Sequence, residues 1–536
     1  MPAVPLWVDI VMVAELGFYL LMRAKIAYLQ SVDPLEAYLS SAHILTLEER
    51  QRLWGRVMQA KSSDVAAYFE SWFFDVTIDD ISQHELQNFV CWCYFDGRNQ
   101  EHLTTEEHDQ LDSFVSHARR LIQKEKRKSM KNLDNEVAAR AMPRPSKKLV
   151  FDAHRKLLDK SLTNSKAIPE AELAEIMRKM TECHETFTEK PSDDEEEKQS
   201  RRFGRPTADP LLGIRVAPLT IHLVFFLLEV VLRVALWFAG FRRCRVNKKA
   251  VYYYHPGSPQ QDKETTPLVF IHGIGVGPVV YLPLIFKMMS SGRPIFLPEI
   301  STVSAMRPWV FPGECLNPDQ VATTLATMLA SHGYTQATFA GHSFGTFWLS
   351  YVIKYAPDIV AGLVFMDPVC FCLYDSSLTR SVVYNQPDPG DVGYLIRTDM
   401  MVNWSVQRHF SWVRGNLLLE ELMEQDVPTV VFLSGDDRVA PSDVQESYLK
   451  QHEECQIEDL DSTPDGYFEK GNLNVVVFRG CDHGHWMLTP EKTLPRIQDA
   501  METLCQRSEA SPPRRLSAPV ARIYARQLAR GSTVPR

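Results

Sequence analysis

The hydrophobic pattern changes near residue 249, and the two sides of that point predict different structures. Before it, apolar residues recur mostly at helical spacing. After it, six short and nearly continuous apolar runs alternate with helical segments: 266–273, 293–300, 336–343, 360–368, 429–437 and 474–484. Such runs are typical of parallel strands that are covered on both faces. We therefore predict an α/β domain with a mostly parallel sheet over residues 249–505.

The first part of the chain predicts a helical domain over residues 30–187. Capping boxes at Thr46-x-x-Glu49 and Thr104-x-x-Glu107 precede amphipathic runs. Residues 188–210 contain an acidic run followed by basic residues, which favours a charged linker. Residues 506–536, rich in Arg, Ser and Pro, are predicted to form a disordered basic tail.

Two apolar stretches are candidates for membrane attachment. Residues 1–29 are broken by Asp9 and Glu15 and suit an uncleaved anchor, a helix in the membrane surface or a core helix. Residues 217–240 are long enough to cross a bilayer, although Glu229 and Arg233 nearly cancel the favourable insertion of the apolar side chains. These two charges are four residues apart and can pair on one helix face. We expect residues 217–240 to form a transmembrane or membrane-embedded helix, in preference to a buried core helix.

Composition narrows the function. The chain has 536 residues, which suggests two or three domains, and its net charge of −9 with no basic helix carrying interleaved aromatics does not favour nucleic-acid binding. The ten cysteines lack zinc-finger spacing and form no visible disulfide framework, which fits a reducing compartment. Together with the basic residues after position 241, this places the α/β domain on the cytosolic side of a membrane whose organelle the sequence does not specify.

A nucleophile is predicted at Ser343. The residues Gly341-His342-Ser343-Phe344-Gly345 lie between a predicted buried strand and a predicted helix that stops at Pro357. A G-x-S-x-G turn in this place holds the serine hydroxyl exposed, and its glycines let strand and helix backbones pass closely.

A serine hydroxyl needs a base and a residue that orients the base. After the strand ending at Ser434, either Asp436 or Asp437 can orient it, and we prefer Asp437 because the loop resembles a G-x-D-x-x-x-P form. After the last strand, His483 and His485 are both candidate bases. We prefer His483, because it is nearer the strand end. The chain order Ser, Asp, His is that of one serine-hydrolase architecture.

The oxyanion of the reaction needs backbone N–H donors. Phe344, directly after the serine, is one candidate, and Gly273 or Ile274 in the segment "HGIGVG" is the other. The same segment could be a dinucleotide loop, but its third glycine is misplaced for G-x-G-x-x-G. We therefore predict no cofactor and no metal.

The motifs "FIHGIG", "GHSFG", "SGDDRVAP" and "GCDHGHW" occur in the order found in the α/β-hydrolase family, and residues 249–505 resemble such a domain. The segments "YYYHPGSPQ" and "MDPVCF" also resemble membrane-associated α/β-hydrolase-like proteins of fungi and single-celled eukaryotes. The family resemblance implies an eight-stranded sheet, Ser-His-Asp hydrolysis and a lid at about residues 373–427. The aromatic residues of that insertion suit an apolar chamber.

These observations predict a membrane-attached serine hydrolase of the esterase or lipase kind, acting on a lipid or another hydrophobic acyl ester. An acyltransferase or thioesterase could use the same residues. A catalytically inactive membrane adaptor, with the helical region binding a partner, is the alternative from another class.

Overall fold

The computed structural model describes residues 6–33, 45–62, 64–140, 203–247, 249–259, 265–391, 393–409, 412–453, 455–464, 466–512 and 514–529, without the side chains of 6, 7, 129–140 and 528. These residues belong to two compact units. The larger unit takes in Met1–Arg50, Cys91–His102 and Arg205–Arg536, and the smaller takes in Gln51–Val90 and Leu103–Gly204.

Helices dominate the region before residue 141, as predicted. They are α3 (Leu47–Ala60), α4 (Val65–Trp72), α5 (Gln83–Tyr94), η1 (Gln100–His102) and α6 (Thr105–Arg140). The smaller unit has an aromatic core in which the rings of Phe69, Phe73 and Phe203 surround Phe89. The predicted domain over 141–187 and most of the predicted linker lie outside the described residues, and 203–210 form neither helix nor strand.

The larger unit is built on one sheet with the strand order β1-β2-β4-β3-β5-β6-β7-β9-β8. Its strands are β1 (Arg242–Arg245), β2 (Val251–His255), β3 (Leu268–Ile271), β4 (Ile295–Glu299), β5 (Ala337–His342), β6 (Val360–Met366), β7 (Thr429–Ser434), β8 (Cys455–Asp459) and β9 (Leu473–Phe478). The pairs β1–β2 and β2–β4 are antiparallel, and all other pairs are parallel. The predicted mostly parallel sheet is confirmed, and the six apolar runs form β3–β7 and β9.

The sheet has nine strands in the part of the chain that the structure describes, where the family resemblance implies eight. The pattern missed β8 because this edge strand is half-exposed and its sequence is Cys-Gln-Ile-Glu-Asp. It also missed β2, which is not among the six apolar runs, and β1, whose sequence is Arg-Arg-Cys-Arg and whose arginines are exposed. A strand at the edge of a sheet needs no continuous apolar run, because part of its surface faces solvent.

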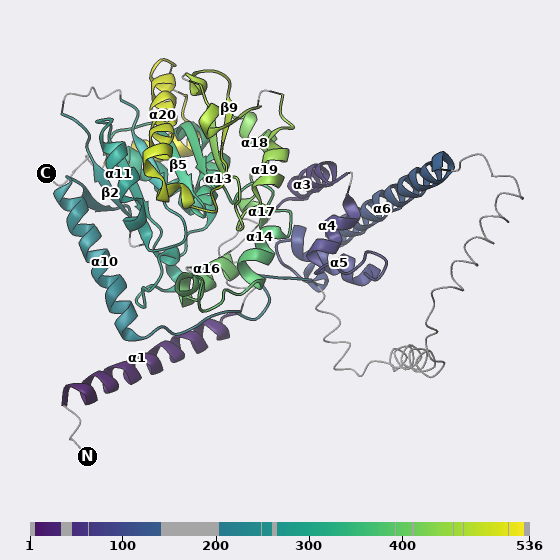
Figure 1. Cartoon of the computed structure of the whole chain (residues 1–536), viewed down its shortest axis with the longest axis horizontal. Helices are drawn as coiled ribbons and strands as arrows, with labels where there is room; N and C mark the ends of the chain where they lie inside the picture. Colours follow the sequence, from purple (N-terminus) through teal and green to yellow (C-terminus); the bar gives the residue numbers. More distant parts are fainter. Residues whose placement is uncertain are drawn as a thin grey trace, which may run out of the picture. The chain divides into compact units, whose positions relative to one another are not determined.

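Helices cover both faces of the sheet (Figure 1). They are α11 (Leu282–Met289), α12 (Pro318–Ser331), α13 (Gly345–Tyr355), α19 (Ser442–Leu449) and α20 (Pro490–Glu509), with short turns η2 (Gly277–Tyr281), η3 (Ser301–Val303), η4 (Pro312–Glu314), η5 (Pro357–Ile359), η7 (Leu460–Ser462), η8 (Tyr467–Glu469) and η9 (His485–Leu488). Helices α11 and α20 pack together, and α20 lies on β5 and β6. Gly362 of β6 allows this contact, because a Cβ there would lie 2.9 Å from Cβ of Leu504.

The predicted lid forms an insertion of short helices between β6 and β7. They are α14 (Ser377–Thr379), the π-helical turn η6 (Arg380–Tyr384), α15 (Tyr394–Arg397), α16 (Met400–His409), α17 (Trp412–Gly415) and α18 (Leu419–Met423). Many of its residues are buried, including Trp404 and Trp412.

Both apolar stretches form helices, α1 (Leu6–Ser31) and α10 (Leu219–Phe238). By length and composition, α10 is the single described helix that could cross a membrane.

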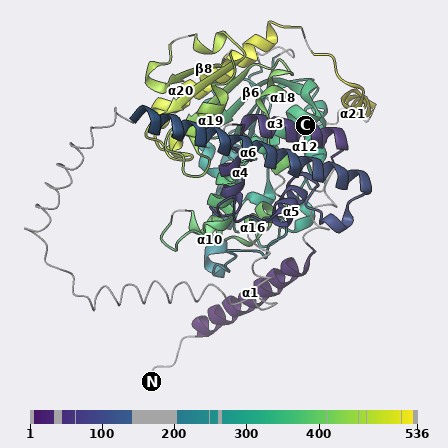
Figure 2. The same ribbon diagram turned by 90° about the vertical axis from the view of Figure 1, so that its right-hand side faces the viewer.

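The prediction of a disordered tail from residue 506 is wrong for its described part. Helix α20 extends to Glu509, and α21 (Ala518–Ala529) packs beside α12 (Figure 2), where it buries Val520 and Tyr524. The segment is rich in Arg and contains few large apolar side chains, so its composition alone did not indicate a packed helix.

Candidate active site

Ser343 lies in a sharp turn between β5 and α13. Its backbone φ of 52° is in the left-handed region, which a residue other than glycine adopts only when the surrounding structure enforces it. The flanking glycines explain how the turn closes. A Cβ at Gly345 would lie 2.2 Å from the carbonyl oxygen of Ile271, and one at Gly341 would lie 3.0 Å from the carbonyl carbon of Gly345. The predicted strand–turn–helix around Ser343 is therefore what the chain forms.

Three of the predicted site residues meet at the carboxyl ends of β5, β7 and β9. His483 Nε2 lies 2.8 Å from Ser343 Oγ, and His483 Nδ1 lies 2.7 Å from Asp437 Oδ2. The second oxygen of Asp437 accepts hydrogen bonds from the amides of Val439 and Ala440, at 2.8 and 2.9 Å, which orient the carboxylate. The arrangement can take a proton from the serine and stabilise a charged imidazole.

The electrostatics of His483 suit a base. Burial would lower its pKa, but the hydrogen bond and charge of Asp437 more than offset this, and the pKa is raised above 6.5. The loop that carries His483 is held to the loop of Asp437 by an ion pair. Arg438 donates from its backbone N and from Nε to Asp482, at 3.0 and 2.6 Å, and Asp482 also accepts from the amide of His483.

The alternative residues lie apart from this arrangement. His485 begins η9, is exposed, and donates its amide to the carbonyl of Asp482. Asp436 is also exposed, and its amide bonds to the carbonyl of Cys481. The structure thus brings His483 and Asp437 to Ser343, and leaves His485 and Asp436 facing solvent.

The candidate oxyanion donors divide in the same way. The amide of Gly273 donates to the hydroxyl of Tyr281 at 3.1 Å, so the prediction of Gly273 as a donor is wrong in this conformation. Ile274 lines the cavity beside Ser343, as does Phe344, which is the N-cap residue of α13. An amide at a helix N-terminus favours a developing negative charge. Gly273 instead allows the close approach of its loop, because a Cβ there would lie 2.9 Å from Ser343 Cβ.

A buried network behind the serine was not predicted. Tyr281 OH also bonds to His342 Nδ1 at 2.7 Å, and His342 Nε2 lies 3.5 Å from Asp367 Oδ2 at the end of β6. Asp367 in turn accepts from the amides of Ser434 and Gly484, at 2.9 and 2.7 Å. One carboxylate therefore ties together the loops that carry the serine, the acid and the base.

The pKa values show how this network is charged. Burial lowers the pKa of His342, which favours the neutral imidazole. Burial would raise the pKa of Asp367, but the hydrogen bond from His342 and other partners lower it. The sequence signal for Asp367 is its place, because it ends a buried strand within "MDPVCF" as Asp437 follows another.

An apolar cavity opens onto Ser343. Its walls come from the turn and helix after β5, from the segments that follow β3, β6 and β7, and from the insertion: Ile274, Ser343, Phe344, Phe347, Val369, Leu378, Thr379, Val382, Val383, Val406 and Val439. The space within it is about 40 Å³, far below the roughly 300–1,000 Å³ of ordinary ligand pockets. The insertion is thus closed over the site. Its aromatic side chains were expected to line the chamber, but Tyr374, Trp404 and Trp412 are buried elsewhere and aliphatic residues take that place.

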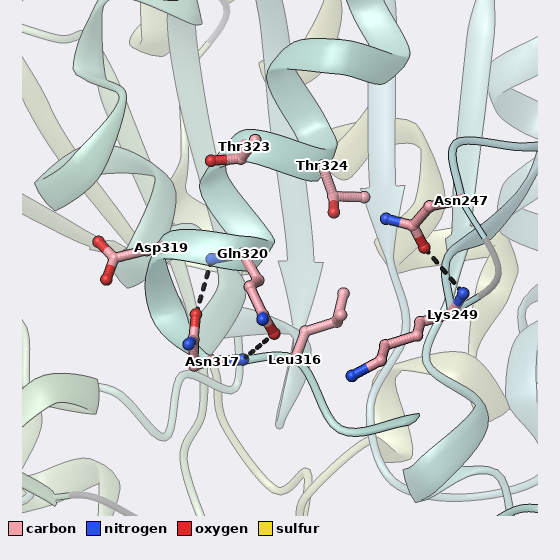
Figure 3. A pocket seen from close by; sticks show the side chains of 8 residues that line it. All are labelled: Asn247, Lys249, Leu316, Asn317, Asp319, Gln320, Thr323 and Thr324. Atoms are coloured by element: carbon pink, nitrogen blue, oxygen red, sulfur yellow. Dashed lines mark hydrogen bonds between the residues drawn. The ribbon is translucent and has the colours of Figure 1, made fainter. Parts of the chain in front are cut away.

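A larger hollow, of about 500 Å³, lies away from Ser343 at the start of α12 (Figure 3). It is lined by Asn247, Lys249, Leu316, Asn317, Asp319, Gln320, Thr323 and Thr324. The side chains of Asn317 and Gln320 form a reciprocal capping box with each other's amides. None of the predicted site residues reaches this hollow.

No protein-family model matches the chain, and no curated protein matches its sequence. Solved structures similar to it include a membrane phospholipase A, described as a novel bacterial virulence factor, with 17% identity over 52% of this chain and 91% of that one (TM-score 0.36). A carboxylesterase structure from the ammonia-oxidizing thaumarchaeon Nitrososphaera gargenis has 13% identity over 49% of this chain and 99% of that one (TM-score 0.36). A putative lipase from Acinetobacter baumannii has 14% identity over 53% and 97% (TM-score 0.35).

The strand order and the turn at Ser343 define the class. A mostly parallel sheet with an antiparallel start, a serine between strand and helix, and Ser, Asp and His in that chain order are the features of the α/β-hydrolases. The chain has the α/β-hydrolase fold, with β8 added at one edge. The similarity to fungal and single-celled eukaryotic proteins stays a prediction, and the similar structures supply neither a substrate nor a mechanism.

Proposed function

We propose that this protein is a membrane-attached serine hydrolase that cleaves an ester with a hydrophobic acyl group. The observation that carries the proposal is the chain of contacts from Ser343 Oγ through His483 to Asp437, at 2.8 and 2.7 Å. An inactive adaptor would need neither the left-handed serine nor a base in contact with it.

The proposed reaction follows from these positions. His483 takes the proton of Ser343 as its oxygen attacks the acyl carbonyl, and Asp437 stabilises the imidazolium. The amides of Phe344 and Ile274 hold the oxyanion. His483 then gives the proton to the leaving alcohol, and a water molecule, activated by the same base, releases the acid and restores the serine.

The walls of the cavity support the substrate class. Nine of its eleven lining residues are aliphatic or aromatic, the other two are Ser343 and Thr379, and no charged side chain is among them. An apolar acyl group would be stabilised by about 0.8 kcal/mol for each CH₂ that it buries. Since the cavity is nearly filled when the insertion is closed, binding of such a group requires segments such as 378–383 to move.

The proposal is tested by reaction of the full-length protein with a fluorophosphonate, in detergent. Ser343 Oγ is expected to attack phosphorus and expel fluoride, which leaves a stable phosphonylated enzyme. Labelling should be absent in Ser343→Ala, with the fold verified by circular dichroism. A folded wild-type protein that does not label in detergent or with lipid present would favour the adaptor instead.

Thr379 is expected to set a preference among esters. It is 2% exposed, lines the cavity and, among the described residues, has no hydrogen-bond partner for its hydroxyl. A buried hydroxyl without a partner costs about 1–3 kcal/mol, so a substrate that supplies one is favoured. Thr379→Val, which keeps the shape, should lower kcat/KM about tenfold for p-nitrophenyl 3-hydroxybutyrate and leave p-nitrophenyl butyrate nearly unchanged. An equal change for both esters would contradict this role.

A further inference from the structure

Helix α10 is attached to the larger unit along its whole length. Its buried residues are His222, Glu229, Leu232 and Leu236, spaced seven, three and four residues apart. This spacing places them on one narrow stripe of the helix, from the first turn to the last. Leu232 and Leu236 belong to the core under the sheet, together with residues of β2 to β4.

An ion-pair cluster fastens the middle of the helix. Glu229 Oε2 lies 3.2 Å from Arg307 Nε, and Arg307 also pairs with Glu299 at the end of β4. All three side chains are less than a tenth exposed. The predicted pair of Glu229 with Arg233 is present as well. The helix centre is therefore bonded to charged groups of the sheet.

Helix α1 is bound to the start of α10 and to the segment 308–310. The carboxylate of Glu15 accepts the amides of Leu219 and Thr220, at 2.7 and 3.1 Å, and so caps α10. Phe18 packs edge-on against His222 at 4.9 Å. Further along, Lys25 Nζ donates to the carbonyl oxygens of Pro308 and Val310. The two helices are held together on the same unit.

The exposed apolar side chains of both helices form what we call the apolar face. Its exposed residues are Ile10, Val11, Met12, Val13, Leu16, Tyr19, Leu20 and Leu21 of α1, and Leu223, Val224, Phe226, Leu227, Leu228, Val230, Val231, Val234, Trp237 and Phe238 of α10. Trp309, itself 47% exposed, extends it, because its ring packs against Phe226. Soluble monomers rarely expose so many large apolar side chains together.

The attachment of α10 decides how this face meets a membrane. If α10 crossed the bilayer, its centre would draw Arg307, Glu299 and the edge of the sheet into the hydrocarbon. Buried charges and open strand edges are strongly disfavoured there. A helix that lies in the interface keeps its buried stripe on the protein and places its exposed apolar side in lipid.

We propose that the apolar face of α1 and α10 docks onto a lipid bilayer and lies in one leaflet, and that α10 does not cross the bilayer. The occupant is lipid rather than a protein, because the exposed side of α10 presents aliphatic and aromatic groups over its full length, whereas protein interfaces carry a polar rim. The basic side chains of Arg242 and Arg245, exposed just after α10, match anionic headgroups.

The apolar face adjoins the walls of the proposed acyl chamber. Ile221 and Phe225 of α10 pack in the same apolar cluster as Ile274, Val382 and Val383, which line the cavity at Ser343. A lipid acyl chain that leaves the leaflet beside the first half of α10 would thus meet the insertion that closes the site. This access route rests on the proposed function, whereas the docking itself does not.

Vesicle binding of the full-length protein tests whether the apolar face docks onto lipid. Wild type and Ser343→Ala are expected to float equally with phosphatidylcholine–phosphatidylserine vesicles, so a failure of the catalytic proposal would leave this result unchanged. The double variant Leu227→Asp/Val231→Asp should bind at least about tenfold more weakly. Ser447→Asp, an added charge at an exposed position of α19, is the matched control and should bind like wild type.

Whether α10 crosses the membrane is tested with two variants that each add one cysteine, Thr220→Cys and Lys249→Cys. These positions are exposed before and after the apolar part of α10. In sealed vesicles a membrane-impermeant maleimide, mapped by peptide mass spectrometry, should label both from outside. Protection of one of them would overturn the in-plane helix in favour of a spanning one. Failure of the wild type to bind vesicles, or self-association in solution that replaces vesicle binding, would overturn the lipid partner.

Discussion

His483→Ala is expected to abolish fluorophosphonate labelling, whereas His485→Ala should label like the wild type. The reason is position. His483 Nε2 is 2.8 Å from Ser343 Oγ and its other nitrogen contacts Asp437, but His485 is exposed at the start of η9. Loss of one member of such a triad lowers kcat by about 10⁴-fold or more. Rates of labelling and of ester hydrolysis, measured side by side for the two variants, give the answer.

The pH dependence supplies a control for the role of His483. A base works when neutral, so kcat/KM should fall as the pH drops below its pKa, which Asp437 holds above 6.5. In Asp437→Asn the offsetting charge is lost while burial remains, so the acidic limb should move to lower pH and kcat should fall. Loss of labelling in His485→Ala but not in His483→Ala would contradict the assignment.

Arg307→Met is expected to destabilise the folded protein by about 3–5 kcal/mol. It leaves Glu299 buried without its main partner and deprives Glu229 of one, and breaking a buried ion pair on one side carries this penalty. Arg233→Met is the matched control. Its side chain is 39% exposed and Glu229 keeps Arg307, so the loss should be about 0–1 kcal/mol. Denaturant unfolding in detergent measures both.

The pH dependence of stability tests whether the ion pair of Arg307 with Glu299 causes this loss. In the wild type, burial would raise the pKa of Glu299, but Arg307 lowers it below 4.5. A lowered pKa gives stability that is present above pH 4.5 and is lost as the pH falls. Without Arg307, the charges of Arg243 and Arg233 still oppose the effect of burial, but the main partner is lost, so the pKa of Glu299 rises and the carboxyl takes up its proton at a higher pH. The difference in the free energy of unfolding between Arg307→Met and wild type should therefore shrink toward acidic pH. An equal loss of stability in Arg233→Met would contradict the role of Arg307 as the main partner of the buried carboxylates.

Much of the α/β domain was determined by the sequence. Continuous apolar runs mark strands that are buried on both faces, and glycines at 341 and 345 are required wherever a strand and a helix pass within 3 Å. Because parallel strands end at one edge, Ser343, the Asp436/Asp437 pair and the two histidines of 483–485 had to converge there. Residue spacing left the choice within each pair open, since neighbours one or two positions apart share the same local pattern.

The tertiary structure decided what local pattern could not. His483 and Asp437 face the serine because a hydrogen-bonded loop, held by Arg438 and Asp482, turns them inward. The amide of Gly273 is taken by Tyr281, which lies eight residues further along the chain.

Long-range pairing also changed the meaning of the charges in the apolar helices. From the sequence, Glu15 and Glu229 only reduce the favourable insertion of their segments into a membrane. In the fold, Glu15 caps α10 from a distance of 204 residues, and Glu229 meets Arg307 and the sheet. A hydropathy sum treats each side chain as if lipid were its only surroundings, so it could show that these segments are apolar but not which side of each helix is already occupied by protein.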